Sequence, residues 1–277
     1  MFKEAFRVAN DSIIIAVPLI FFIKIIDLYS NFALYRADST AKFFLATITL
    51  IFLVGAFSAA YFYMVKRSIE ISKKVFVIDS DRTKEILEIF KSSHDGISKY
   101  FVSFAAVYII LLAIEILLTP LVYLTGVRLI GHISPELIQG IQSVAADSSA
   151  VSAFVDGLTT ADMIFFAKWS LLLVAVASIL MFLLMLWIPE IIYKTRNPLS
   201  ALFKSIKKVF VNFGKSVKIY LGLYALGFLV FCLASFSFSN LAVYFISNFV
   251  IYYFYLYITI LIFLYYDKKY NVTDNEE

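Results

Sequence analysis

An apolar stretch without any charged residue runs from Trp169 to Pro189, between Lys168 and Glu190. An α-helix rises about 1.5 Å per residue, so a helix over this stretch can cross a hydrocarbon core of about 30 Å. Helices of soluble domains usually keep one polar face, which this stretch lacks. The stretch therefore predicts a transmembrane helix, and the other elements of the chain have to be compatible with a membrane.

Five further apolar stretches are long enough to form helices of the same kind. Hydrophobic residues make up 62% of the 277 residues and charged residues 16%, whereas about 25% of residues in soluble domains are charged. We therefore expect an all-α fold, a polytopic transmembrane helix bundle that forms one integral membrane domain over residues 1–277. Its six spans are predicted at residues 13–34, 43–65, 100–125, 163–192, 217–238 and 241–266.

The connections between these spans differ in length and polarity. Only Ser239 and Asn240 separate the last two spans, which are therefore expected to form an antiparallel hairpin. Residues 127–162 are slightly acidic and contain Ser134-Pro135-Glu136, a sequence that predicts the start of a short helix. The tail from Asp267 is charged and is expected to be disordered.

The connection between the fourth and fifth spans predicts the orientation of the chain. Residues 194–218 contain seven Lys and Arg residues and no acidic residue. Because basic connections are retained in the cytoplasm, this segment is expected on the cytoplasmic side. With six spans, both termini then lie in the cytoplasm and residues 127–162 lie outside it. The chain is predicted to be a multi-pass protein of the cell membrane.

The same basic segment predicts a cytoplasmic amphipathic helix at the membrane interface. Asn197 suits the N-cap position, Pro198 the first helical position and Gly214 the end of the helix. Its apolar residues recur every three or four positions: Leu202, Phe203, Ile206, Val209, Phe210 and Phe213. This face either lies among acyl chains or packs on neighbouring helices. In the first interpretation anionic lipid headgroups contact Lys204, Lys207, Lys208 and Lys215.

Three ionisable residues lie deep in the apolar stretches: Lys24, Asp27 and Glu115. A charge at the centre of a transmembrane helix costs about 2.5 to 3.5 kcal/mol on insertion scales, so each residue needs a partner or water. Lys24 and Asp27 are three positions apart and share one helical face. We expect the three side chains to form one intramembrane polar cluster, which acts either as a structural ion pair or as a proton or substrate relay.

The sequence contains no recognisable catalytic or metal-binding pattern. His94 is expected in the cytoplasm and His132 outside it, so the two imidazoles cannot share a metal ion. Cys232 has no second cysteine to pair with, and no H-E-x-x-H, P-loop or G-x-S-x-G pattern occurs. The basic residues are explained by cytoplasmic connections rather than by nucleic acid. We expect no catalytic residue, metal, cofactor or nucleic-acid partner.

Two segments carry a resemblance to known proteins. They are the start of the chain, Phe2-Lys3-Glu4-Ala5-Phe6, and Pro198-Leu199-Ser200-Ala201-Leu202-Phe203-Lys204-Ser205 with Asn212-Phe213 before the last hairpin. The chain resembles a group of six-helix prokaryotic membrane proteins that includes the Yip1-like proteins, the UPF0259-type proteins and the membrane domain of some glycerophosphodiester phosphodiesterases. The resemblance covers the whole chain in topology but only these residues in pattern. It implies an accessory membrane protein rather than an enzyme.

Two functional hypotheses follow. The first is a non-catalytic integral membrane protein that acts as a scaffold, an accessory subunit or an organiser of the membrane. Its partners would be the lipid bilayer, anionic lipid headgroups and a protein partner or a second copy of the chain. The alternative is a small transporter or channel component that uses the polar cluster of Lys24, Asp27 and Glu115.

Overall fold

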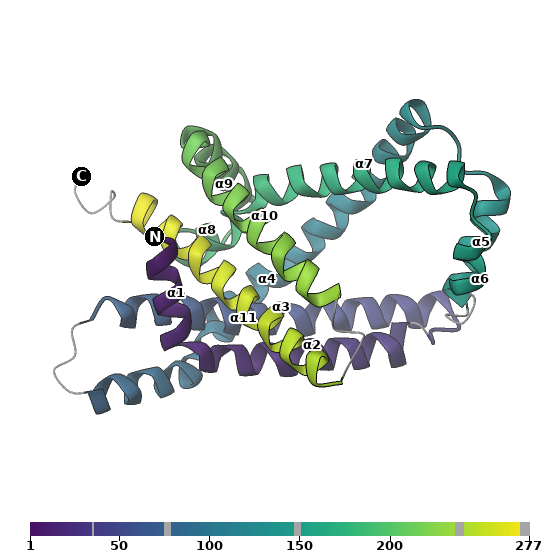
Figure 1. Cartoon of the computed structure of the whole chain (residues 1–277). Coiled ribbons are helices and arrows are strands. Elements are labelled where there is room, and N and C mark those ends of the chain that lie inside the picture. Colours follow the sequence, from purple (N-terminus) through teal and green to yellow (C-terminus); the bar gives the residue numbers. More distant parts are fainter. Residues whose placement is uncertain (35, 75–78, 147–150, 236–240, 272–277) are drawn as a thin grey trace. The chain divides into compact units, whose positions relative to one another are not determined.

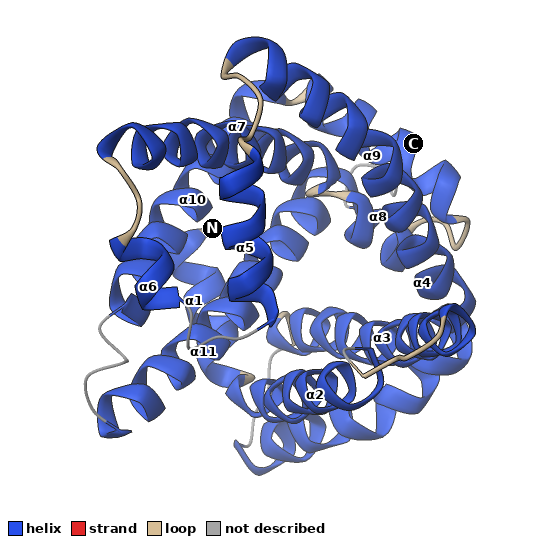
Figure 2. Cartoon of the chain, turned by 90° about the vertical axis from the view of Figure 1, so that its right-hand side faces the viewer, coloured by secondary structure: helices blue, strands red, loops and turns tan. Residues whose placement is uncertain are grey.

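The computed structural model describes residues 1–34, 36–74, 79–146, 151–235 and 241–271, and its regular elements are helices (Figure 1, Figure 2). The predicted all-α class is confirmed over these residues. The chain divides into two compact units. Unit 1 comprises Met1–Ile109 and Leu183–Glu277, and unit 2 comprises Ile110–Phe182.

Unit 1 contains most of the helices. It begins with α1 (Phe2–Asp11), η1 (Ile13–Ile15), α2 (Ala16–Tyr29), η2 (Ser30–Leu34), α3 (Thr40–Ser72) and the first part of α4 (Asp79–Leu129). It continues with α8 (Trp187–Tyr193), α9 (Pro198–Val211), α10 (Phe213–Ser235), α11 (Leu241–Tyr266) and η5 (Asp267–Asn271). Unit 2 holds the rest of α4 and then α5 (Pro135–Ala146), α6 (Val151–Asp156) and α7 (Thr160–Leu184).

Six segments of the described chain are long and apolar enough to cross a membrane. They are Ile13–Ala33, Thr40–Ser72, Thr83–Leu129, Thr160–Tyr193, Phe213–Cys232 and Ile246–Asn271. Each of them overlaps one of the six predicted spans, as expected for a multi-pass membrane protein. The structure extends the second and third spans, because α3 continues to Ser72 and α4 already begins at Asp79. The predicted turn at Ser239 and Asn240 lies outside the described residues.

The fourth predicted span consists of two helices. α7 ends at Leu184, and α8 begins at Trp187. In a continuous helix the ring of Pro189 would clash with the carbonyl group of Met185, and Pro189 has no amide hydrogen to bond to it. The break at Met185 and Leu186 removes this clash. It also makes α8 a separate short helix, which packs on α9.

α11 is the central helix of unit 1. It contacts α1, α2, α3, α8 and α10, and Figure 1 shows it running among them. Its C-terminal half buries Leu256 and Ile260 completely. Phe263 of α11 stacks on Phe62 of α3 with 5.9 Å between the ring centroids, and Phe62 also stacks on Phe104 of α4 at 5.5 Å. Aromatic pairs of this kind contribute about 0.5 to 1.5 kcal/mol beyond the area that they bury.

α3 and the first part of α4 approach each other through residues with small side chains. A Cβ atom added at Gly96 would lie 2.7 Å from the carbonyl oxygen of Ala59, and one at Gly55 would lie 3.1 Å from the amide nitrogen of Ala105. Transmembrane helices associate through such close van der Waals contact, since lipid offers little hydrophobic driving force between them. At Gly96 a larger residue would force the two helices to shift, whereas at Gly55 it would make a tight contact.

In unit 2, two helices start at capping residues. α5 begins at Pro135, as predicted, and the hydroxyl of Ser134 accepts a hydrogen bond of 3.3 Å from the amide of Leu137. At the start of α7 the hydroxyl of Thr159 accepts a bond of 3.2 Å from the amide of Asp162, whose carboxylate accepts one of 3.0 Å from the amide of Thr159. Such reciprocal bonds satisfy amides that the first helical turn leaves unpaired.

Candidate functional site

The residues that end α11 and form η5 contact the other helices of unit 1 one after another. We call Tyr265–Asn271 and their side-chain partners the C-terminal junction. Tyr265 bonds to α10, Tyr266 to α8, Asp267 to the end of α3, Lys268 to α1 and Tyr270 to α9. The predicted disorder of the tail is wrong for Asp267–Asn271, where Asp267 and Tyr270 are buried.

The centre of the junction is the buried carboxylate of Glu190, a residue only 1% exposed. Its Oε2 atom accepts hydrogen bonds from the Lys208 ammonium at 2.7 Å and from the Tyr266 hydroxyl at 2.6 Å. The Lys208 ammonium also donates to the Tyr266 hydroxyl at 2.7 Å and lies 4.8 Å and 5.2 Å from the ring centroids of Tyr266 and Tyr270. The charge of Glu190 is thus compensated within the protein, as burial requires.

Local sequence explains how Lys208 reaches this position. The side chain of Asn197 accepts a hydrogen bond of 3.0 Å from the amide of Ser200, and Pro198 occupies the first turn, so α9 starts where the sequence predicts. The indole of Trp187 donates to the carbonyl oxygen of Pro198 at 2.8 Å, which ties the start of α8 to the start of α9. Lys208, three turns later, then faces Glu190.

The other polar groups of the junction are paired as well. Asp267 forms an ion pair with Lys73, and Lys268 forms one of 2.5 Å with Glu4. The hydroxyls of Tyr265 and Ser216 are 3.0 Å apart. The hydroxyl of Tyr270 donates to the carbonyl oxygen of Lys208 at 2.9 Å and accepts a bond of 2.9 Å from the side chain of Asn212. A network in which each carboxylate has a lysine partner fits a role in fastening helices together.

The predicted apolar face of α9 is buried in one part and exposed in another. Leu202 and Val209 are buried against unit 1, whereas Phe203 is 70% exposed and Phe210 is also exposed. Lys204, Lys207 and Lys215 are exposed, but Lys208 turns inward to Glu190. The helix ends at Val211, so the prediction that it ends at Gly214 is wrong: Gly214 and Phe213 belong to α10.

The predicted intramembrane cluster is described only in part. The Lys24 ammonium lies 3.7 Å from the Asp27 carboxylate within α2, and both side chains are 57% exposed. Glu115 lies in unit 2, where its side chain is exposed and its backbone carbonyl accepts a bond of 2.8 Å from the Thr119 hydroxyl. The participation of Glu115 stays a prediction.

The remaining candidates from the sequence give no further site. His94 lies in α4 within unit 1, and His132 follows α4 in unit 2. Cys232 lies in α10 with a partly exposed side chain. Within the described residues, no group of three or more His, Cys, Asp or Glu side chains is placed to hold a metal ion.

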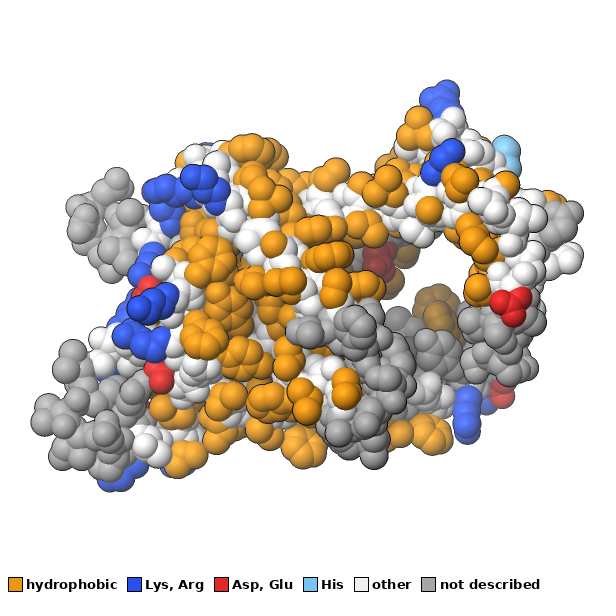
Figure 3. Space-filling model, in the orientation of Figure 1, with side chains coloured by type: hydrophobic (Ala, Val, Ile, Leu, Met, Phe, Trp, Pro, Cys, Tyr) orange, Lys and Arg blue, Asp and Glu red, His pale blue; other side chains and the backbone are white. Residues whose placement is uncertain are grey.

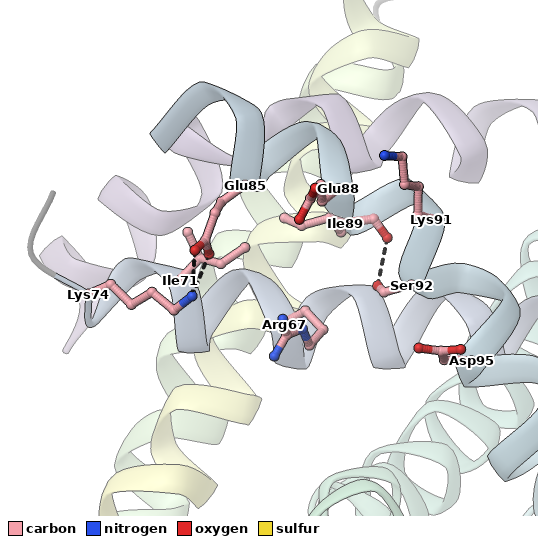
Figure 4. A pocket seen from close by; sticks show the side chains of 9 residues that line it. All are labelled: Arg67, Ile71, Lys74, Glu85, Glu88, Ile89, Lys91, Ser92 and Asp95. Atoms are coloured by element: carbon pink, nitrogen blue, oxygen red, sulfur yellow. Dashed lines mark hydrogen bonds and ion pairs between the residues drawn. The ribbon is translucent and has the colours of Figure 1, made fainter. Parts of the chain in front are cut away.

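A pocket of about 320 Å³ lies between the end of α3 and the start of α4 (Figure 4). Its charged lining residues are Arg67, Lys74 and Lys91 together with Glu85, Glu88 and Asp95. The ammonium of Lys74 is 2.6 Å from the carboxylate of Glu85, which Figure 4 shows as a dashed contact across the pocket. Because acids and bases are equal in number, this pocket favours neither an anion nor a cation.

Comparisons of the chain with protein-family models, with curated proteins and with solved structures give no match.

Sequence reasoning treated Glu190 only as the end of a span and missed its role in the junction. One signal was available: Glu190 is the only acidic residue between Asp162 and Asp267. A solitary carboxylate beside an apolar stretch, followed by a segment rich in lysine, indicates an ion pair. Tyr266 could not be assigned in this way, because tyrosines are frequent throughout the chain.

Proposed function

We propose that the chain is a non-catalytic multi-pass membrane protein that organises the anionic lipid surface at the cytoplasmic side and serves there as a scaffold or accessory subunit. One observation carries this proposal. Two short helices of unit 1, α1 and α9, each pack one side on the protein and expose phenylalanine and basic side chains on the other.

α1 has this arrangement in its first two turns. Ala5, Val8 and Ala9 are buried, and α1 packs on α11. Phe2 and Phe6 are exposed, and the basic residues at positions 3 and 7 are exposed beside them. Such a surface matches the boundary between acyl chains and headgroups, since the rings enter the apolar layer while the cations stay near phosphate.

α9 repeats the arrangement. Leu199, Phe203 and Phe210 form an exposed apolar stripe beside Lys204 and Lys207. A basic side chain near an anionic membrane surface contributes about 1 kcal/mol to binding. Figure 3 shows basic side chains gathered at the end of unit 1 where α1 begins and α11 ends, with apolar side chains over its middle. This distribution supports a lipid-facing body with a basic end, whereas the exposed charges at the start of α3 include the ion pair of Lys42 with Asp38.

The resemblance to six-helix accessory membrane proteins supports the same proposal, because α1 contains the first of the two segments on which it rests and α9 contains residues 198–205 of the second. A protein partner or a second copy of the chain would bind beside the lipid surface.

The test uses the full chain with Cys232→Ala and a single new cysteine, Phe203→Cys or Lys204→Cys, each labelled with an environment-sensitive fluorophore. Adjacent helical residues point about 100° apart. In vesicles that contain nitroxide-labelled lipids we expect strong quenching at position 203 and weaker quenching at position 204. Equal, weak quenching at both positions would contradict an interfacial α9.

The preference of the protein for anionic lipid is measured with the chain that lacks these cysteine substitutions. We expect spin-labelled phosphatidylglycerol to be immobilised at the protein more than phosphatidylcholine, and the preference to fall in the double variant Lys204→Gln and Lys207→Gln. The control is Lys84→Gln, which removes one exposed charge at a site outside α1 and α9.

The second candidate function is a small transporter or channel component. It is favoured by the ion pair of Lys24 and Asp27 within the apolar α2. Purified protein in sealed vesicles would then move an ion or solute, and the paired change of Lys24→Met and Asp27→Asn would abolish the flux. Absence of flux from the unchanged protein leaves the first proposal in place.

A further inference from the structure

One side of α2 is exposed in the described chain. α2 packs on α3 and α11, whereas Val17, Phe21, Lys24 and Leu28 are exposed, Phe21 to 67% and Leu28 to 60%. These four residues follow one another at intervals of four, three and four positions, so they lie within an arc of about 60° around the helix. We call them, together with the exposed Asp27 at their edge, the α2 face.

The charged residues of the α2 face lie near the middle of a candidate membrane span. Lys24 is eleven residues from the start of the span at Ile13 and nine residues from its end at Ala33. At 1.5 Å per residue, the nearer end of the span is about 14 Å away. A lysine side chain is much shorter than this distance, so the ammonium cannot reach the headgroups by snorkelling. Charged side chains at this depth need protein or water around them.

Lys24 and Asp27 compensate each other only loosely. The ammonium lies 3.7 Å from the carboxylate, whereas a hydrogen-bonded ion pair has a distance of about 2.7 to 2.9 Å. Within the described residues, neither charged side chain forms a hydrogen bond. Polar groups without hydrogen bonds are costly in an apolar environment. The pair therefore has free donors and acceptors for a polar partner at the same depth in the membrane.

The α2 face is complementary to itself. Two copies of the chain insert in the same orientation, so two α2 helices related by a two-fold axis along the membrane normal run parallel. Lys24 and Asp27 are three residues apart, about 4.5 Å along the helix, which a lysine side chain can span. Lys24 of each copy can then pair with Asp27 of the partner subunit. A partner of any other sequence would need an acid and a base at the same spacing and depth.

We propose that the α2 face is the contact surface between two copies of the chain, joined by two reciprocal ion pairs of Lys24 with Asp27 of the partner subunit. Phe21 and Leu28 supply apolar contacts on either side of these pairs, since transmembrane helices associate through close packing. The inference gives the scaffold role a specific partner and rests on that part of the proposed function. It does not involve the lipid-facing residues of α1 and α9.

The position of the contact is tested by cysteine cross-linking of the full chain in membranes, in the Cys232→Ala background. Leu28→Cys and Phe228→Cys are matched, because the two native side chains are 60% and 61% exposed and lie five and four residues before the ends of their spans. Oxidation with copper phenanthroline should join Leu28→Cys chains into dimers, whereas Phe228→Cys chains should stay monomeric. Equal yields at the two positions would overturn the α2 face as the contact surface.

The reciprocal ion pairs are tested by changing the charges in two chains that carry different affinity tags. Lys24→Asp gives a chain with two acids on the α2 face, and Asp27→Lys gives a chain with two bases. Each variant should associate poorly with itself, whereas the two variants expressed together should co-purify, because each acid then faces a base. Failure of the mixture to co-purify, with both variants present in the membrane, would overturn the reciprocal pairs.

An uncharged variant keeps the test decisive if the charge-changed chains do not insert. Lys24→Met with Asp27→Leu should weaken dimerisation in liposomes about sevenfold, because two interhelical polar contacts of average strength are lost. The measurement is energy transfer between differently labelled copies at decreasing ratios of protein to lipid. The matched control, Lys42→Met with Asp38→Leu, removes an exposed ion pair outside the α2 face and should leave the affinity unchanged. An unchanged affinity in the first variant would overturn the inference.

Further outcomes separate this inference from the alternatives. Cross-linking of Leu28→Cys to a protein of another mass would overturn the second copy as the partner. If Glu115→Gln lowers the dimer affinity as much as Asp27→Asn does, Lys24 pairs with Glu115, and the reciprocal pairs are overturned. Lipid quenching at Phe203→Cys should be the same with and without Lys24→Met and Asp27→Leu, so loss of the dimer leaves the lipid-surface function standing. Equal, weak quenching at positions 203 and 204 contradicts only the lipid-surface function.

Discussion

The hydroxyl of Tyr266 donates a hydrogen bond of 2.6 Å to the carboxylate of Glu190, which lies 76 positions earlier in the chain. Because Lys208 donates to both groups, one buried carboxylate joins α8, α9 and α11. A carboxylate in this position depends on both donors, since burial removes the water that would otherwise solvate it.

The first prediction concerns Lys208. Lys208→Met leaves the carboxylate of Glu190 buried without its cation, and breaking a buried pair from one side costs on the order of 3 to 5 kcal/mol. We expect a lower unfolding temperature in detergent, measured by the fluorescence of the tryptophans. Lys204→Met, which removes an exposed lysine from the same helix, should leave that temperature nearly unchanged.

A second substitution makes this prediction specific. Adding Glu190→Gln to Lys208→Met removes the uncompensated charge and should restore part of the lost stability. Losses that simply add would show that the two side chains do not interact.

The second prediction concerns the contact between α3 and α4. A Cβ atom at Gly96 would lie 2.8 Å from the Cβ atom of Tyr63 as well as close to the backbone of Ala59. Gly96→Ala should therefore separate the helices and cost about 1 to 3 kcal/mol. Gly214→Ala is the matched control, because a Cβ atom there meets nothing within 4 Å. Equal stability of the two variants would mean that α3 and α4 do not pack closely at Gly96.

The third prediction concerns the intramembrane charges. Lys24→Met removes the partner of Asp27 and leaves a carboxylate in an apolar helix, at a cost of about 2.5 to 3.5 kcal/mol on insertion scales. We expect a loss of thermal stability, and its partial recovery when Asp27→Asn is added. If Glu115→Gln changes the stability of the Lys24→Met variant by the same amount as that of the unchanged protein, Glu115 does not belong to the cluster.

The fourth prediction is the topology. In a Cys232→Ala background, Asp156→Cys should react with a membrane-impermeant maleimide in intact cells. Lys204→Cys should react only after the membrane is permeabilised, because the basic segment 194–218 is expected in the cytoplasm. Both positions are exposed, so their reactivity reports their side of the membrane. The reverse pattern would invert the orientation of the whole chain.

Local features of the fold could be predicted from the sequence. The spans follow from long apolar stretches, and the starts of α5 and α9 follow from Ser134 and Asn197, because a helix cap involves only residues of the first turn. The break before α8 also has a local cause in Pro189, although residues 163–192 were predicted to form one helix.

The candidate site could not be predicted in the same way. The burial of Glu190 depends on the packing of α11 against α8, a contact between residues far apart in the sequence. The order of Asp267–Asn271 has the same origin: a charged composition predicts disorder, but Lys73 compensates Asp267 and Tyr270 packs beneath Lys208. The burial of Glu190 and the order of Asp267–Asn271 both depend on partners far away in the sequence, and amino-acid composition does not predict such contacts.

The central position of α11 has a consequence for biogenesis. A ribosome completes α1, α2, α3, α8 and α10 before it reaches α11, the helix that all five contact. These helices enter the bilayer without their shared partner, and Glu190 has only Lys208 to compensate it until Tyr266 is translated. A nascent chain that stops before residue 241 would therefore present uncovered helix surfaces to the quality-control proteases of the membrane. Once α11 has inserted, it covers these surfaces and completes the core of unit 1.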